Sequence, residues 1–159
     1  MSLEEEIGRL LKKHGLTLAI AESATGGLLT HLITNVSGSS EYCEGGMVTY
    51  SNRMKEEELG VKEETLKKHG AVSSEVAQEM ASGIRRKRGV DIALSTTGIA
   101  GPTGATPGKP VGLFYIGLSS LQGTFSKKYQ FQGTRLQNKQ RAVREALSML
   151  KHHLLKHYP

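Results

Sequence analysis

Cysteine and aspartate are almost missing from the 159-residue sequence. The one cysteine, Cys43, cannot form a disulfide within the chain, and together with the lack of a signal peptide this favours a cytoplasmic location. Asp91 is the only aspartate among 15 acidic residues, which excludes catalysis by paired aspartates, a DxD metal site and an EF-hand loop. We therefore expect no bound metal.

Aromatic side chains and long apolar runs are also scarce. Tryptophan is absent and aromatic residues make up 5% of the chain, so no stacking platform accompanies the basic residues, and nucleic acid is disfavoured as a partner. No apolar run approaches the roughly 20 residues that cross a bilayer, so no membrane partner is expected. Positive charge (+6 overall) and glycine (19 residues) are plentiful. Both suit a small anionic ligand that the backbone approaches closely.

The spacing of apolar residues predicts alternating helices and strands. Helices are expected over residues 3–14, 28–36, from 52 onward, 63–69, 74–87 and 136–157, and strands over residues 16–21, 46–50, 90–96, 111–119 and 124–131. The last two strands form a hairpin around Leu121–Gly123. The sequence therefore predicts one α/β domain, residues 1–159, with three layers: a mixed, mostly parallel sheet flanked by helices.

Two glycine-rich segments resemble nucleotide-binding loops without matching them. Residues 104–110 have three rather than four residues between the glycines and end in Pro110, and residues 98–104 read GxxGxxG rather than GxGxxG. The histidines near the C-terminus, His152, His153 and His157, have no carboxylate close by in sequence, which favours a solvated tail over a metal site. We therefore predict no cofactor. The glycine-rich stretch is interpreted as ligand-lining, with a plain surface loop as the alternative.

Residues 22–27, Glu-Ser-Ala-Thr-Gly-Gly, turn a predicted strand into a predicted helix and place Ser23 at the end of the sheet. The amides of Thr25, Gly26 and Gly27 are then donors without partners, suited to an oxyanion or a phosphate. The alternative is that Ser23 or Thr25 simply caps the helix. The local pattern leaves both interpretations open.

A second segment, Tyr50–Lys55, carries a serine and a lysine. If a helix begins at Asn52, Ser51 and Lys55 lie one turn apart on the same face. A lysine acts as a general base when burial or a nearby cation lowers its pKa towards about 7–8, and Ser–Lys hydrolases need no histidine or aspartate. An ordinary exposed lysine is the alternative at this spacing.

Several segments in order resemble the CinA C-terminal domain family. They are residues 21–27, residues 48–52 with Lys55, and residues 70–73, 97–102, 109–112 and 133–135, and they extend over nearly the whole chain. Ala24 departs from the cysteine that is common at that point of the family. The resemblance implies an α/β fold and an amidohydrolase that converts nicotinamide mononucleotide into nicotinic acid mononucleotide and ammonia.

The resemblance also implies roles for the matched residues. Ser23 matches the nucleophile and Lys55 its base, while Tyr50 and Ser51 match neighbouring catalytic positions, and Ser51 stays open as an alternative nucleophile. The substrate-binding residues that it implies are Thr25, Gly26, Gly27, Asn52, Thr97, Gly98, Ala100, Gly101 and Arg135.

The partners expected are a phosphorylated nucleotide as substrate and further copies of the chain in a homo-oligomer. A second class of function stays open, namely a non-catalytic accessory protein that binds a phosphorylated metabolite or nucleic acid and is linked to competence or DNA damage. Release of ammonia from nicotinamide mononucleotide separates the two classes.

Overall fold

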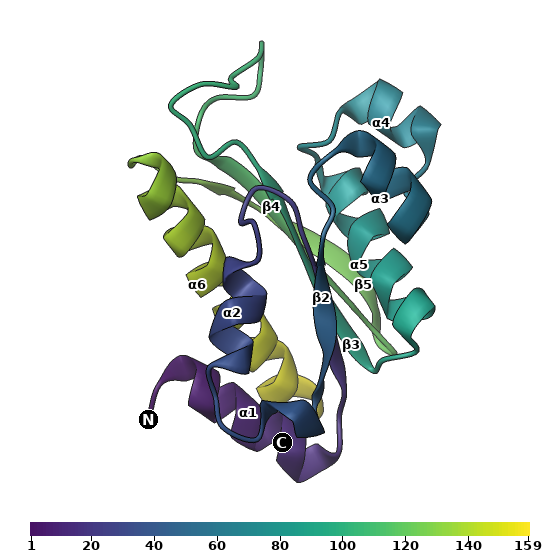
Figure 1. Ribbon diagram of the computed structural model, residues 1–159, viewed down its shortest axis with the longest axis vertical. Helices are drawn as coiled ribbons and strands as arrows, with labels where there is room; N and C mark the ends of the chain where they lie inside the picture. The colour runs from purple at the N-terminus through teal and green to yellow at the C-terminus, as the bar shows by residue number, and fades with distance from the viewer.

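The computed structural model describes residues 1–159 and is built around one five-stranded sheet (Figure 1). Its strands lie in the order β2-β1-β3-β4-β5. β1 pairs in parallel with both β2 and β3, whereas β4 pairs antiparallel with β3 and β5. The mixed sheet is therefore confirmed, with β4 alone running in the opposite direction. The strands are β1 (Leu18–Glu22), β2 (Cys43–Val48), β3 (Ile92–Gly98), β4 (Leu113–Ser120) and β5 (Gly123–Gln130).

Helices cover both faces of the sheet, as predicted. α1, α2 and α6 pack together on one face, and α5 lies against the other with α3 and α4 beside it (Figure 1). The helices are α1 (Leu3–His14), α2 (Leu28–Thr34), α3 (Asn52–Leu59), α4 (Glu63–His69), α5 (Ser74–Arg88) and α6 (Arg135–His157), with a short 3-10 turn at Ser39–Glu41. None of these helices is long and apolar enough to cross a bilayer.

Each face of the sheet carries its own buried cluster. The larger cluster joins alternate residues of β1, β3 and β4, such as Ile20, Leu94 and Leu118, to the inner faces of α1, α2 and α6. The smaller one joins the opposite side chains of β1 and β3, which are small alanines, to α5 through Val76 and Met80. The period of two along a strand produces this division of the core.

The predicted strand at 46–50 is wrong in its bounds, because the observed strand is Cys43–Val48. Its backbone pairs with β1 from Cys43 onward although Glu44, Gly45 and Gly46 offer no apolar side chain. Backbone pairing needs only amide and carbonyl groups, so an apolar pattern missed the first half of this edge strand.

The three parallel strands end together at one edge of the sheet. β1 ends at Glu22, which pairs with both Val48 of β2 and Thr96 of β3. The segments after these strands, residues 23–27, 49–51 and 99–112, therefore meet at this edge. Ligands of open α/β sheets bind outside the carboxyl ends of the strands, so this is where a site is expected.

Candidate active site

A cavity of about 310 Å³ opens at the carboxyl ends of β1 and β3. Its walls contain two cations, Lys55 and Arg135, and no carboxylate, imidazole or thiol. The volume lies at the small end of the range for ligand pockets. The lining residues are Ser23, Ala24, Tyr50, Asn52, Lys55, Ala71, Val72, Thr97, Gly98, Ile99, Ala100, Thr103, Gly104 and Arg135.

Lys55 is the most unusual side chain of this cavity, because it is a lysine with only 1% of its surface exposed. It lies in the first turns of α3 and points into the protein. Its Nζ lies 3.0 Å from Ser23 Oγ, 2.9 Å from the carbonyl oxygen of Thr49 and 3.0 Å from that of Tyr50. No carboxylate forms an ion pair with it, and burial lowers the pKa of the Lys55 ammonium from 10.5 to about 8.

The three contacts of Lys55 suit both of its protonation states. The ammonium donates its three N–H groups to Ser23 Oγ and to the two carbonyl oxygens. When one proton is lost, the two carbonyl oxygens can hold the two remaining N–H groups, and the lone pair then faces the hydroxyl of Ser23. A pKa of about 8 makes the neutral form accessible close to neutral pH. Ser23 and Lys55 therefore have the geometry of a nucleophile and its general base.

Ser23 is held by the turn that follows β1 and is 7% exposed. Its own amide donates to the carbonyl oxygen of Thr96 in β3 at 3.0 Å. The amides of the next two residues, Ala24 and Thr25, make no hydrogen bond within the chain. Two unpaired N–H groups directly after a serine hydroxyl are suited to an oxyanion that forms on a carbonyl attacked by that hydroxyl.

The expectation that Gly26 and Gly27 also offer free amides is wrong. The Gly26 amide donates to the Ser23 carbonyl oxygen at 3.0 Å, and the Gly27 amide donates to Glu22 Oε1 at 3.2 Å. The alternative that Ser23 or Thr25 caps the helix is also wrong, because the N-cap of α2 is Gly27. Thr25, Gly26 and Gly27 are not among the residues that line the cavity.

Glu22 is the acceptor of the Gly27 amide, and sequence reasoning missed this role of its carboxylate. Its carboxylate is fully buried and occupies the N-terminal end of α2. It accepts the amides of Leu29 and Thr30 at 2.9 Å each, and the hydroxyls of Thr25 and Thr30 at 2.6 and 2.7 Å. A carboxylate with so many donors fixes the turn that carries Ser23.

Ser51 lies outside the cavity, whereas its neighbours Tyr50 and Asn52 line it. The Ser51 hydroxyl accepts the Met54 amide at 3.1 Å and caps α3, so it does not contact Lys55, whose side chain turns inward. Tyr50 is 62% exposed, and its hydroxyl lies 3.5 Å from Nη2 of Arg135.

The end of β3 and the segment that follows it supply another wall of the cavity. Thr97, Gly98 and Ala100 line the cavity, and the Thr97 hydroxyl donates to the carbonyl oxygen of Ala71 at 2.8 Å. Gly101 lies behind the wall with φ +89°, and its carbonyl oxygen accepts Nη1 of Arg135 at 2.8 Å. Arg135 thus links the start of α6 to this loop.

Six lining residues were not predicted as site residues. Three of them, Ile99, Thr103 and Gly104, lie in the glycine-rich stretch that the sequence indicates to be ligand-lining, but none of the six carries a titratable group that would single it out. Ala24 follows Ser23 directly, whereas the approach of the other five to Ser23 depends on the packing of distant loops. The six residues are Ala24, Ala71, Val72, Ile99, Thr103 and Gly104.

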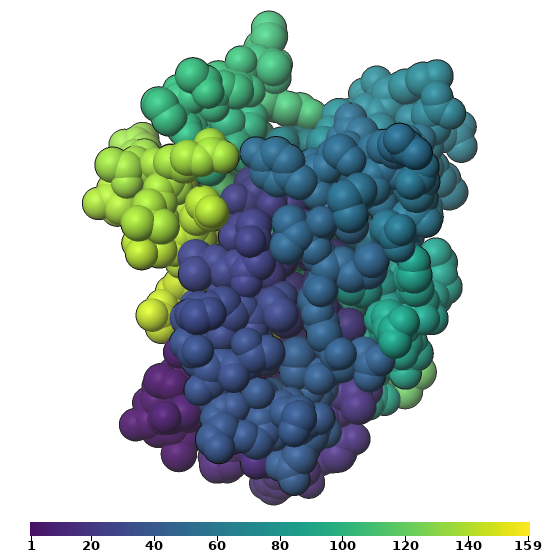
Figure 2. Space-filling view, in the orientation of Figure 1, coloured from purple at the N-terminus to yellow at the C-terminus, as the bar shows by residue number.

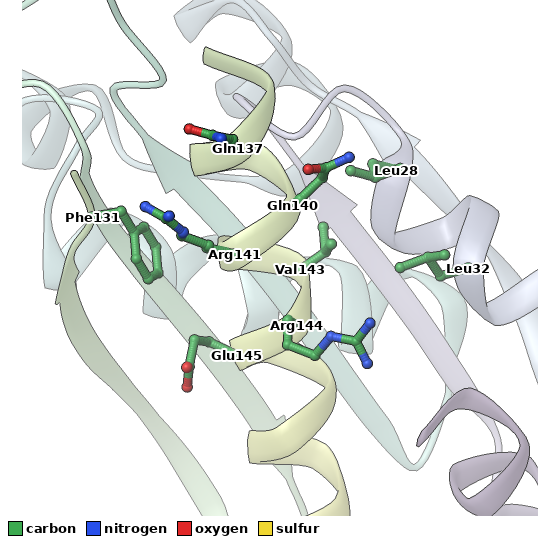
Figure 3. A pocket seen from close by; sticks show the side chains of 9 residues that line it. All are labelled: Leu28, Leu32, Phe131, Gln137, Gln140, Arg141, Val143, Arg144 and Glu145. Carbon is green, nitrogen blue, oxygen red and sulfur yellow. The ribbon is translucent and has the colours of Figure 1, made fainter. Parts of the chain in front are cut away.

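A larger groove of about 780 Å³ runs along α6 and is shown in Figure 3. In Figure 3, Leu28 and Leu32 of α2 lie on one side of α6, and Phe131 lies on the other side of α6. Its polar residues are glutamines, arginines and one glutamate, none of them paired as a nucleophile with a base. The smaller cavity is therefore the candidate for catalysis.

Comparison with known proteins identifies relatives along nearly the whole chain. The family model of the CinA C-terminal domain matches residues 1–154. A CinA-like protein of Chloroherpeton thalassium is 53% identical over 155 residues, which cover 95% of this chain and 37% of the relative. A CinA-like protein of Kosmotoga olearia is 53% identical over 154 residues, covering 97% and 37%. The chain spans about 37% of the length of these curated relatives.

Solved structures with the same fold include two bacterial proteins. The competence damage-inducible protein A of Klebsiella pneumoniae has a TM-score of 0.94 at 36% identity, covering 99% of this chain and 97% of its own. The competence/damage inducible protein of Agrobacterium tumefaciens has a TM-score of 0.88 at 36% identity, covering 96% of both chains.

Proposed function

This chain belongs to the CinA C-terminal domain family, and from that premise we propose that it hydrolyses the carboxamide of nicotinamide mononucleotide to nicotinic acid mononucleotide and ammonia. The observation that carries the proposal is the 3.0 Å contact between Lys55 Nζ and Ser23 Oγ, made by a buried lysine whose pKa is about 8. A serine beside a neutral amine is a nucleophile for acyl transfer.

The first half of the reaction transfers the acyl group to the enzyme. Lys55 takes the Ser23 hydroxyl proton while the serine oxygen forms a bond to the carboxamide carbon. The electron pair of the carbonyl moves to its oxygen, which the amides of Ala24 and Thr25 stabilise. When the tetrahedral intermediate collapses, the carbon–nitrogen bond breaks. Lys55 returns its proton to the leaving nitrogen, which departs as ammonia.

The second half releases the acid. Water takes the place of ammonia, Lys55 removes one of its protons, and the resulting hydroxide attacks the acyl carbon. Collapse of the second intermediate breaks the bond to the Ser23 oxygen, which regains a proton from Lys55. The enzyme returns to its starting state, with one water consumed and one ammonia produced.

The electrostatics of the cavity support a substrate of this kind. The pyridinium ring withdraws electrons from the carboxamide carbon and makes it easier to attack. The phosphate supplies negative charge to a cavity whose walls hold the cation Arg135 and no acidic residue. A nucleoside monophosphate therefore complements both the reactive pair and the charge of the walls.

Ser23→Ala tests the proposal directly. We expect it to lower kcat by several orders of magnitude in an ammonia-release assay, because the covalent nucleophile is lost. Ser51→Ala is the matched control, since the Ser51 hydroxyl caps α3 and makes no hydrogen bond to the Lys55 side chain. It should retain activity within about tenfold of wild type. The substitution removes a helix cap, which costs about 1 kcal/mol of stability, and leaves the nucleophile in place. Activity of Ser23→Ala within tenfold of wild type would refute the assignment.

Lys55→Arg separates a base from an anchor. Arginine keeps the positive charge, yet its guanidinium stays protonated at any working pH and supplies no lone pair. If Lys55 is the base, Lys55→Arg and Lys55→Met should be nearly equally inactive. Substantial activity of the arginine variant alone would assign Lys55 to substrate binding.

A further inference from the structure

We propose that Lys139 of α6 is a specificity-determining residue which, together with Arg135, binds the phosphate group of the substrate. Lys139 does not line the cavity that holds Ser23. The inference deepens the proposed function and rests on it for the identity of the substrate. The anion subsite can also be tested on its own, because phosphate binding needs no turnover.

Arg135 and Lys139 project from the same face of α6. They are four residues apart, which places them one helical turn from each other. The same face carries Asn138 and Ala142, which anchor it to the active-site loops. Asn138 Nδ2 donates to the Ala100 carbonyl oxygen at 2.9 Å, and Ala142 packs in one buried cluster with Ala24 and Ala100.

Lys139 reaches the turn that carries the nucleophile. Its Nζ lies 3.5 Å from the position that a Cβ atom would take on Gly26. The Gly26 amide donates to the carbonyl oxygen of Ser23, so the ammonium lies over the same turn as the nucleophile. In Figure 2 the start of α6, coloured yellow-green, borders the purple segment after β1, and α3 lies on the other side of that segment.

The charges of Arg135 and Lys139 have no acidic partner in the chain. Lys139 is half-buried and forms neither a hydrogen bond nor an ion pair. Arg135 donates only to the uncharged oxygens of Gly101 and Tyr50. Arg135 is exposed and Lys139 is half-buried, and neither has a counter-charge in the chain, so an anionic ligand would meet both charges without displacing an acidic side chain.

The start of α6 also departs from the electrostatic pattern of the other long helices. The first turn of α1 carries Glu4, Glu5 and Glu6, and that of α5 carries Glu75, whereas the first turn of α6 has no acidic residue and begins with Arg135. Negative side chains stabilise helix N-termini and positive ones destabilise them. Cations in the first turns of α6 work against helix stability, and such local conflicts are expected where residues serve a ligand.

A phosphate matches this pair better than a carboxylate does. Arginine offers a planar fork of donors and lysine offers a point charge, so together they reach more than one oxygen of a phosphate. The subsite lies beside the turn of Ser23, so it can hold the phosphate of a nucleotide whose carboxamide faces the nucleophile. The walls of the cavity offer no acidic residue that would repel this group.

Lys139→Met is the test, with Lys13→Met as the matched control. Lys13 is an exposed lysine of α1 outside the ion pairs of the chain, so the control removes the same net charge far from the site. We expect Lys139→Met to lower kcat/KM for nicotinamide mononucleotide ten- to hundredfold, mainly through KM, because a charge-assisted hydrogen bond is lost. The kcat/KM for nicotinamide riboside, which has no phosphate, should change less than twofold.

Direct binding makes the result independent of turnover. Calorimetric titration of wild type with nicotinic acid mononucleotide and with inorganic phosphate should give an affinity that falls at least tenfold in Lys139→Met. Lys139→Arg should keep most of it, and Lys13→Met all of it. Circular dichroism of each variant verifies the fold, and Lys139→Gln replaces the methionine variant if that one unfolds.

The outcomes distinguish the two proposals. Wild type that binds phosphate through Lys139 but releases no ammonia would refute the proposed function and leave the anion subsite standing. Wild type that deamidates mononucleotide and riboside equally well would refute the subsite. Unchanged phosphate affinity in Lys139→Met would also refute it.

Discussion

Lys55→Met removes the one titratable group that the proposed chemistry requires. Methionine keeps an unbranched side chain of similar length, so the packing of α3 against the sheet edge is retained. The ammonium and its contacts with Ser23 Oγ and the two carbonyl oxygens are lost. Because burial lowers the pKa of Lys55 to about 8, the variant differs from wild type in a way that depends on pH.

The first consequence is a pH profile for the wild-type rate. With a pKa of about 8, roughly a tenth of Lys55 is neutral at pH 7 and roughly nine tenths at pH 9. Since only the neutral amine accepts the Ser23 proton, kcat/KM should rise about tenfold over this interval and then level off. Lys55→Met should show a low rate without this rise.

The second consequence concerns stability. The unfolded chain holds the Lys55 proton with the ordinary pKa of 10.5, whereas the folded protein releases it near 8. Between these two values the unfolded state binds more protons, so the free energy of unfolding rises with pH. This difference in pKa raises the free energy of unfolding by about 3 kcal/mol in total as the pH passes through both pKa values. About 2 kcal/mol of this increase falls between pH 7 and pH 9.5.

Urea unfolding of both proteins, followed by circular dichroism, measures this contribution. From pH 7 to pH 9.5 the free energy of unfolding of wild type should increase relative to that of Lys55→Met by about 2 kcal/mol. Other groups titrate in both proteins and cancel in the difference. A difference that stays constant over this interval, or a rate already level at pH 7, would refute the view that burial depresses the pKa of Lys55.

Three further substitutions test the framework around the nucleophile, each by urea unfolding. Glu22→Ala should destabilise the fold by about 3–5 kcal/mol, because the amides and hydroxyls that the buried carboxylate accepts lose their partner; a loss below 1 kcal/mol would contradict this role. Gly46→Ala should cost about 1–3 kcal/mol, since its Cβ would lie 2.1 Å from Thr30 Oγ1, which donates to Glu22; unchanged stability would contradict the clash. Gly101→Val should cost at least about 2 kcal/mol and raise KM, because its φ of +89° disfavours a β-branched residue and its Cβ would lie 2.4 Å from Val111 Cγ1; a neutral result would show that the loop relaxes freely.

The fold class and most helices follow from local sequence patterns. The capping box at Ser2 and Glu5 and the glycine after His14 bound α1 as predicted, and Glu63–His69 matches α4 residue for residue. These signals depend on neighbours within one or two turns, so a single sequence carries them. The parallel arrangement of β1, β2 and β3 follows in turn from the helices that connect them.

Local sequence patterns identified Ser23 and Lys55 only as separate candidates, and it was the family resemblance that implied their pairing; the contacts that they make are decided by the tertiary structure. The spacing placed Lys55 and Ser51 on one helix face. In the folded chain Ser51 is the N-cap of α3, and the Lys55 side chain points towards Ser23, 32 residues away. The amides of Gly26 and Gly27 were predicted to be free, yet Glu22 and the Ser23 carbonyl oxygen accept them.

Both differences have the same physical reason. Periodicity fixes the face of an element on which a side chain lies, but the partner of a long side chain depends on which other segments pack against that face. Lys55 has four rotatable bonds and can reach several acceptors, and burial between the ends of β1 and β2 selects one set of them. The sequence determined the elements and the chemical groups, and the convergence of the strand ends at one edge of the sheet made them a site.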